Sequence, residues 1–117
     1  MNAKELENIK FLEQEIKMWN EYLQALKKRS LEKVQTEQQA TSIEETGEII
    51  KDLMCKLEKQ KKEAIEFIAQ IPYSYIRMGI VYKYQEGLTW REAAQRMGFM
   101  NEDSLRTAIR RYLKEHG

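Results

Sequence analysis

The sequence predicts an all-α fold, and three observations support this prediction. The chain of 117 residues contains one proline and five glycines, so few positions interrupt a helix. Charged residues make up 33% of the chain, which suits helices with wide solvated faces. Apolar residues recur at steps of three and four, the period of an α-helix. A chain of this length forms one domain, or a small domain with an extension.

The first long stripe of apolar residues predicts a helix of about 30 residues, with a length of about 45 Å. Its heptad-like members are Leu6, Ile9, Leu12 (or Glu13), Ile16, Trp19, Leu23 and Leu26, and Leu31 and Val34 extend it. Phe11, Trp19 and Tyr22 lie partly beside this stripe and widen it. Either they cover a third helix over Tyr73–Gln85, or they serve self-association or docking on a partner protein.

The polar and poorly periodic stretch from Gln35 to Gly47 predicts a loop. A second apolar stripe follows, consisting of Ile50, Leu53, Leu57, Ala64, Ile68 and Ile71. It ends at Pro72, because the residue before a proline is pushed out of the helical region, and Pro72 can itself start the next helix. Two long helices joined by a loop predict a coiled-coil-like antiparallel hairpin. Cys55 falls among apolar neighbours, so we expect a buried, inert thiol.

Two shorter helices around a glycine turn are predicted near the C-terminus. Thr89 and Glu92 have the spacing of a capping box, which predicts a helix over Trp90–Met97. Gly98 suits the left-handed backbone that ends a helix, and Asn101 can cap a second helix. A capped helix, a glycine turn and a basic helix are the parts of a helix-turn-helix. We therefore expect a helical hairpin for assembly over residues 1–72 and a helix-turn-helix domain over residues 73–117.

The spacing of apolar residues predicts the core of this second region. Core positions are expected at Ala93, Ala94, Met97, Leu105, Ile109, Tyr112 and Leu113, with Phe99 filling the gap at the turn. The opposite face of the second helix carries arginines, whose planar forks can bond a guanine edge or a phosphate. The alternative is a solvated basic helix end, since the helix dipole favours cations there.

The candidate DNA-binding residues lie in both short helices. They are Thr89, Arg91, Glu102, Asp103, Ser104, Arg106, Thr107, Arg110, Arg111 and Lys114. The N-terminal end of a recognition helix meets base edges, which favours Arg106 for base contacts. Arg110, Arg111 and Lys114 lie further along, and we expect them at phosphates together with Thr89 and Arg91.

The distribution of charge agrees with this placement. Residues 1–72 contain 12 Lys or Arg and 14 Asp or Glu, a net charge of −2. Residues 73–117 contain 8 Lys or Arg and 5 Asp or Glu, a net charge of +3. The basic excess therefore lies where phosphate contacts are needed, but it is modest. A single copy should bind DNA weakly, so a dimer or a larger assembly should supply the rest.

The C-terminal residues resemble a known family. The run TWREAAQRMGFMNEDSLRTAIRRYL is similar to the DNA-binding domain of the sigma-factor region 4-like proteins of bacteriophages and integrated mobile elements. The matching parts are Thr89-Trp90-Arg91-Glu92, Ala93-Ala94, Gly98-Phe99 and Arg111-Tyr112-Leu113. The resemblance covers roughly residues 76–114, and the turn before Leu105 is about one residue longer than in the standard motif. It implies DNA binding in transcription or in phage DNA metabolism.

Enzymatic chemistry has little support in the sequence. The only histidine, His116, is next to the C-terminal residue, and no Cys and His spacing suits zinc. Glycines are too scattered for a phosphate-binding loop, and the glutamates fall on helix faces where they pair with lysines, so we expect no enzyme and no cofactor. The single cysteine fits a reducing cytoplasm. The first residues lack the apolar core of a signal peptide, and no run of 18 apolar residues predicts a membrane span.

The predicted function is that of a DNA-binding transcription regulator of phage or mobile-element type, in the cytoplasm of a bacterial host. One alternative is a small terminase subunit, which also joins a helix-turn-helix to an oligomerising helical part. A second alternative is an adaptor that binds proteins without touching DNA. The expected partner is double-stranded DNA. RNA polymerase and a second copy of the chain, bound through the N-terminal helices, are further candidate partners, and no membrane is expected.

Overall fold

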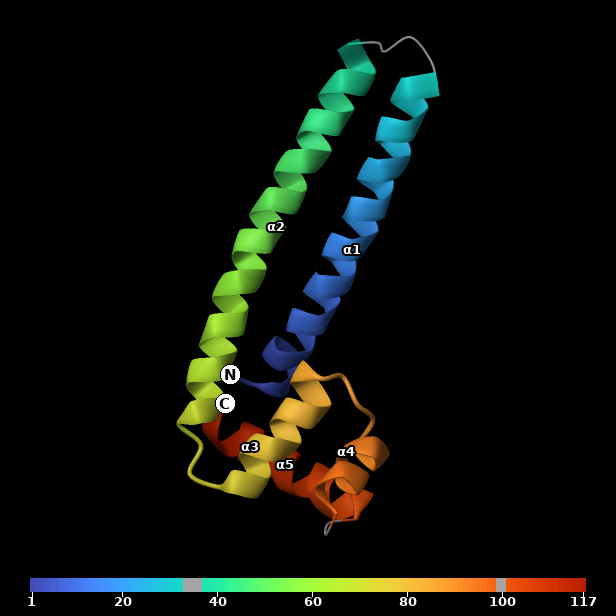
Figure 1. Cartoon of the computed structure of the whole chain (residues 1–117). Helices are drawn as coiled ribbons and strands as arrows, with labels where there is room; N and C mark the ends of the chain where they lie inside the picture. The colour runs from blue at the N-terminus through green and yellow to red at the C-terminus, as the bar shows by residue number, and fades with distance from the viewer. Residues whose placement is uncertain (33–36, 99–100) are drawn as a thin grey trace. The chain divides into compact units, whose positions relative to one another are not determined.

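The structure is a computed structural model and describes residues 1–32, 37–98 and 101–117. All regular elements among these residues are helical, which confirms the predicted all-α fold (Figure 1). In chain order they are α1 (Ala3–Glu32), α2 (Glu37–Ala69), α3 (Ser74–Ile80), the π-helical turn η1 (Val81–Gln85), α4 (Trp90–Met97) and α5 (Glu102–His116). Two long helices therefore precede the shorter ones, as the sequence predicts.

Contacts between residues divide the chain into two units. Unit 1 consists of Met1–Lys10 and Gln60–Gly117, and unit 2 consists of Phe11–Lys59. The long helices α1 and α2 contribute residues to both units. The units therefore do not coincide with the expected division at residue 72, because the first residues of α1 and the end of α2 group with the C-terminal helices.

Unit 2 is formed by parts of α1 and α2, which run antiparallel (Figure 1). The predicted apolar stripes face inward here. Leu12 and Ile16 of α1 and Ile50 of α2 are buried. Further stripe residues in this unit are half-buried, namely Trp19, Leu23, Leu26, Leu53 and Leu57. The side chains of Leu31 and Val34 lie outside the described residues.

The start of α2 corrects the loop expected from Gln35 to Gly47. The helix begins at Glu37, so residues 37–47 are helical, while Gln35 and Thr36 lie outside the described residues. Gln, Glu and Ala are strong helix formers even without an apolar period. Thr46 is buried, and its hydroxyl donates a 2.7 Å hydrogen bond to the carbonyl oxygen of Ser42 one turn earlier. The polar composition of residues 37–47 therefore does not predict a loop, because helix propensity alone supports a helix there.

The expectation of a buried Cys55 is wrong, because the thiol is exposed. Its neighbours Leu53 and Leu57 are half-buried, but each is two positions away. Two positions on a helix correspond to about 200° of rotation, so Cys55 points away from the seam that its neighbours face.

Unit 1 contains the larger set of buried apolar residues. These are Leu6, Ile9, Ala64, Ile68, Ile71, Ile76, Ile80, Tyr84, Ala93, Ala94, Met97, Leu105, Ile109 and Leu113. The helices α3 and α5 approach closely at Gly79, where an added Cβ would overlap the side chain of Ile109 and lie 3.0 Å from that of Leu105. The chain ends also meet in this unit, since a Cβ on Gly117 would lie 3.0 Å from Cα of Asn2.

The connection from α2 to α3 differs from the expectation for Pro72. The helix α3 begins at Ser74, with Tyr73 as its N-cap, so Pro72 precedes the helix instead of starting it. The guanidinium of Arg77, in the last turn of α3, donates a 2.5 Å hydrogen bond to the carbonyl oxygen of Ile71, which lies two residues after the end of α2. The π-turn η1 follows α3 and buries Tyr84.

Candidate nucleic-acid interface

The start and end of α4 have the predicted capping geometry. The hydroxyl of Thr89 accepts a 3.1 Å hydrogen bond from the N–H of Glu92, and the Glu92 carboxylate accepts one of 3.4 Å from the N–H of Thr89. Gly98 ends the helix with φ of 77°, and its N–H donates to the carbonyl oxygen of Ala94. The capping box and the glycine C-cap are both confirmed.

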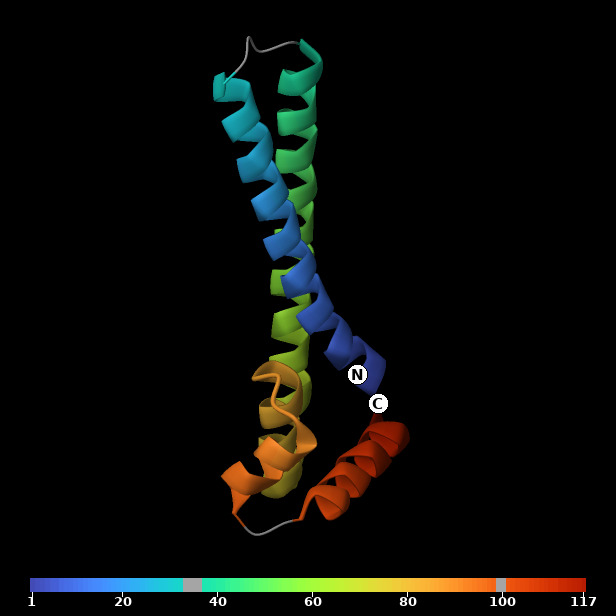
Figure 2. The ribbon, with the colours of Figure 1, turned by 90° about the vertical axis from the view of Figure 1, so that its right-hand side faces the viewer.

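The start of α5 is also capped as predicted. The side-chain oxygen of Asn101 accepts a 2.8 Å hydrogen bond from the N–H of Ser104. Glu102 and Asp103 lie in the first turn, where the helix dipole favours negative charge. Phe99, which we expected to fill the gap at the turn, lies outside the described residues. Figure 2 shows that α4 and α5 run in different directions from their connection.

The buried face of α5 fixes the direction in which its other side chains point. Leu105, Ile109 and Leu113 are four residues apart and at most 3% exposed. Ala93, Ala94 and Met97 of α4 are buried as well, so six of the predicted core positions are confirmed. Tyr112 is half-buried, and its ring meets that of Tyr73 edge-on, with 6.4 Å between their centroids.

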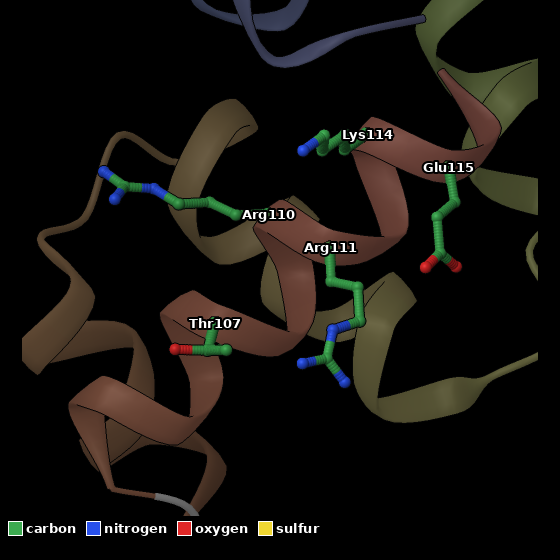
Figure 3. Close-up of a pocket in the computed structure, with 5 residues that line it drawn as sticks. All are labelled: Thr107, Arg110, Arg111, Lys114 and Glu115. Atoms are coloured by element: carbon green, nitrogen blue, oxygen red, sulfur yellow. The ribbon is translucent and has the colours of Figure 1, made fainter.

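The exposed face of α5 brings together several candidate residues. Thr107, Arg110, Arg111 and Lys114 line a surface hollow of about 580 Å³, together with Glu115 (Figure 3). In Figure 3 the side chains of Arg110 and Lys114 extend from α5 in a similar direction, and that of Arg111 takes a different one. Three of the five side chains that line the hollow are therefore cationic.

Glu115 was not among the candidate residues, although it lines the same hollow. Its position four residues after Arg111 is the signal that places both on one side of the helix. The negative charge of this carboxylate lowers the local positive potential and limits the extent of the cationic surface.

Arg106 differs from the other cations of α5. Its guanidinium forms a 2.5 Å ion pair with the carboxylate of Asp103, and its side chain is 36% exposed. Ion pairs on a surface contribute about 0–1 kcal/mol, so a stronger acceptor can replace Asp103. The contact holds the Arg106 side chain at the N-terminal half of α5, where Glu102 and Ser104 are also exposed.

The remaining candidates lie at the start of α4 and are not among the residues that line the hollow. The hydroxyl of Thr89 is engaged in the capping box, and Arg91 is exposed. Sequence reasoning missed Lys83 of η1, whose ammonium lies 5.2 Å from the ring centroid of Trp90. The π-turn that positions Lys83 has no clear signal in the sequence.

Tyr84 links η1 to the cationic face electrostatically. Burial raises the pKa of its hydroxyl, the charge of Glu7 raises it further, and the positive charge of Arg110 lowers it. The ring of Tyr84 also meets that of Trp90 edge-on, at a centroid distance of 6.2 Å. Arg110 is therefore close enough to the packed side of unit 1 to influence a buried group.

Neither a metal-binding cluster nor a membrane-spanning helix is found in the described part of the chain. No group of three or more His, Cys, Asp or Glu side chains is placed to hold a metal ion there. No helix among those residues is long and apolar enough to cross a bilayer. Comparison of the chain with protein-family models, curated proteins and solved structures found no match.

Proposed function

We propose that unit 1 binds double-stranded DNA and that α5 enters the major groove. The observation that carries this proposal is the division of α5 into two faces. Leu105, Ile109 and Leu113 are buried, whereas Arg110 and Lys114 are exposed on the other side. A helix held by its apolar face and displaying arginines and lysines is the arrangement that helix-turn-helix proteins use. The capped start of α4 adds backbone N–H groups that suit a phosphate.

The role we propose in the cell is that of a transcription regulator. It follows from the resemblance of the Thr89-Trp90 opening, the Gly98-Phe99 turn and the Arg111-Tyr112-Leu113 ending to sigma region 4-like proteins. Sequence-specific contacts are assigned to Arg106, because it lies on the N-terminal half of α5. Positioning contacts to phosphates are assigned to Arg110, Arg111 and Lys114.

The test is the affinity of purified variants for a selected site and for random DNA, each at several salt concentrations. Arg106→Ala should cost about 1–3 kcal/mol at the selected site and relax its sequence preference. Arg110→Ala should weaken binding to both DNAs and reduce the salt slope by about 1. Lys56→Ala, which changes an exposed cation of unit 2, is the matched control and should leave both affinities unchanged.

Two results would contradict the assignment. If Arg106→Ala lowered the affinity for both DNAs equally, Arg106 would not make sequence-specific base contacts. If the wild-type protein showed no dependence of affinity on salt, the DNA-binding proposal would be wrong, because phosphate contacts release counterions. An adaptor that binds proteins without touching DNA would instead show no measurable affinity for either DNA at any salt concentration.

A further inference from the structure

A second, exposed apolar stripe runs along α1 within unit 2. It consists of Phe11, Met18 and Tyr22, which are 64%, 48% and 47% exposed. Their spacing of seven and four residues puts them on one line of the helix. This outer stripe lies about 100° around the helix from Leu12, which faces the seam with α2. Large apolar side chains lined up in water mark a surface that binds another protein surface.

Two charged residues of unit 2 on the same line differ in sign. Glu15 lies between Phe11 and Met18, and Arg29 lies eighteen residues, or five turns, after Phe11. Both are exposed. Within unit 2 the line of the outer stripe therefore carries a negative charge near Phe11 and a positive charge beyond Tyr22. A second α1 in the opposite direction complements this order of charges, whereas a parallel α1 places like charges side by side.

We propose that two copies of the chain associate through the outer stripe, with their α1 helices antiparallel and a two-fold axis between Met18 and Tyr22. Each Met18 then packs against the partner's Tyr22. Each Arg29 lies over the partner's Phe11, which provides a cation–π contact, and within one turn of the partner's Glu15. The occupant of this surface is thus a second copy of the same helix, and the association does not depend on DNA binding.

Trp19 holds two residues of this surface in place before association. Its indole N–H donates a 3.0 Å hydrogen bond to the carboxylate of Glu15. Its ring meets that of Tyr22 edge-on, with 5.8 Å between the centroids. Side chains that are already ordered lose less freedom on binding, so less of the contact energy is spent on fixing them.

The first experiment is sedimentation equilibrium of the full chain over a series of concentrations. The wild type should approach twice the monomer mass of 14.0 kDa. Met18→Asp should remain monomeric and keep the helical circular dichroism spectrum of the folded chain, since the substituted side chain is exposed. Met54→Asp, at a methionine of α2 with 49% exposure, is the matched control and should still dimerise. A wild type that stays monomeric, or that forms a ring of many copies, overturns the proposal.

The second experiment reverses charges and does not require an apolar residue to be changed. Glu15→Arg and Arg29→Glu should each raise the dimer dissociation constant about tenfold, because two symmetric contacts are lost. The double variant restores opposite charges between the antiparallel copies and should recover part of the loss, although the cation–π contact of Arg29 with Phe11 is still missing. Additive losses in the double variant would overturn the antiparallel pairing.

Cross-linking tests the direction of the helices independently. In a Cys55→Ser background, proteins with Met18→Cys and with Tyr22→Cys are mixed and treated with a short bismaleimide. An antiparallel dimer should yield mainly links between position 18 and position 22. A predominance of links between identical positions would mean a parallel dimer and would contradict the proposal.

Discussion

Unit 1 and unit 2 bury their apolar residues to different degrees. In unit 1, Ile80, Leu105 and Ile109 have no exposed surface. In the described part of unit 2, the most buried apolar side chain, Ile50, is 7% exposed, and Phe11 is 64% exposed. Several helix segments that cross can enclose a side chain from all directions, whereas two helices can cover one face each.

This difference fits the two roles proposed above. A closed core holds α5 rigidly, which a surface for reading DNA requires. An open pair of helices leaves apolar side chains in water, which suits association with another copy. The comparison also predicts that the free energy of unfolding depends more strongly on residues of unit 1 than on those of unit 2.

The largest effect is expected from cavities in the two seams. Ile109→Ala should lower the free energy of unfolding by about 2–5 kcal/mol, because it empties a fully buried position of unit 1. Leu23→Ala changes a half-buried position of unit 2 and should cost about 1 kcal/mol. Denaturant titrations followed by circular dichroism measure both. Equal losses would mean that the two units do not differ in packing as described.

A pair of glycine substitutions sharpens the same comparison. Gly79→Ala should destabilise by about 1–3 kcal/mol, because the new methyl group overlaps Ile109 in unit 1. Gly47→Ala, in the helical part of unit 2, meets nothing within 4 Å and should stabilise by about 0.5–1 kcal/mol through helix propensity. The same denaturant titration checks both signs. Stabilisation by Gly79→Ala would contradict the close approach of α3 and α5.

The sequence alone predicted the elements whose signals are local. The capping box at Thr89, the left-handed Gly98 and the cap at Asn101 each depend on a few neighbouring residues, so their geometry could be predicted. The buried positions of α5 follow from the helical period alone. The same local reasoning placed the cations of α5 on one exposed face. In the structure, Arg110 and Lys114 of that face line a common hollow.

Other features were missed, some because a local signal was given too little weight and some because they depend on contacts between distant residues. The helical start of α2 was missed because Glu37 to Gly47 lacks an apolar period, although helix propensity is sufficient there. The exposure of Cys55 was missed because apolar neighbours in sequence point elsewhere around a helix. The π-turn that buries Tyr84 brings its ring against that of Trp90, which lies in the next helix, and no local pattern in the sequence indicates this contact. The role of Glu115 in the hollow required the three-dimensional arrangement.

At Gly98, which ends α4, the stability cost of a substitution should depend only on how well the new residue adopts the left-handed backbone conformation. Gly98 has φ of 77°, and an added Cβ would meet nothing within 4 Å. Gly98→Val should therefore cost about 1–2 kcal/mol through backbone strain, and should weaken DNA binding along with stability. Gly98→Asn is the matched control and should cost less, because asparagine adopts the left-handed conformation more readily. Unchanged stability of the valine variant would contradict the placement of this turn.

The smallest effect concerns the stability of unit 1 at high pH. Burial raises the pKa of Tyr84 above 10.0, so the folded state keeps this hydroxyl protonated where the unfolded state loses its proton. The contribution is fully present below the unfolded pKa, and stability is lost as the pH rises through the folded pKa. Tyr84→Phe should remove this alkaline loss, whereas Arg110→Ala should enlarge it, because Arg110 lowers the pKa of Tyr84.

The measurement is the free energy of unfolding between about pH 9 and pH 11, a range that brackets the unfolded pKa. Tyr22→Phe in unit 2 is the control, and any loss that remains in both phenylalanine variants comes from other groups. If Tyr84→Phe kept the full alkaline loss, the buried hydroxyl would not be its source.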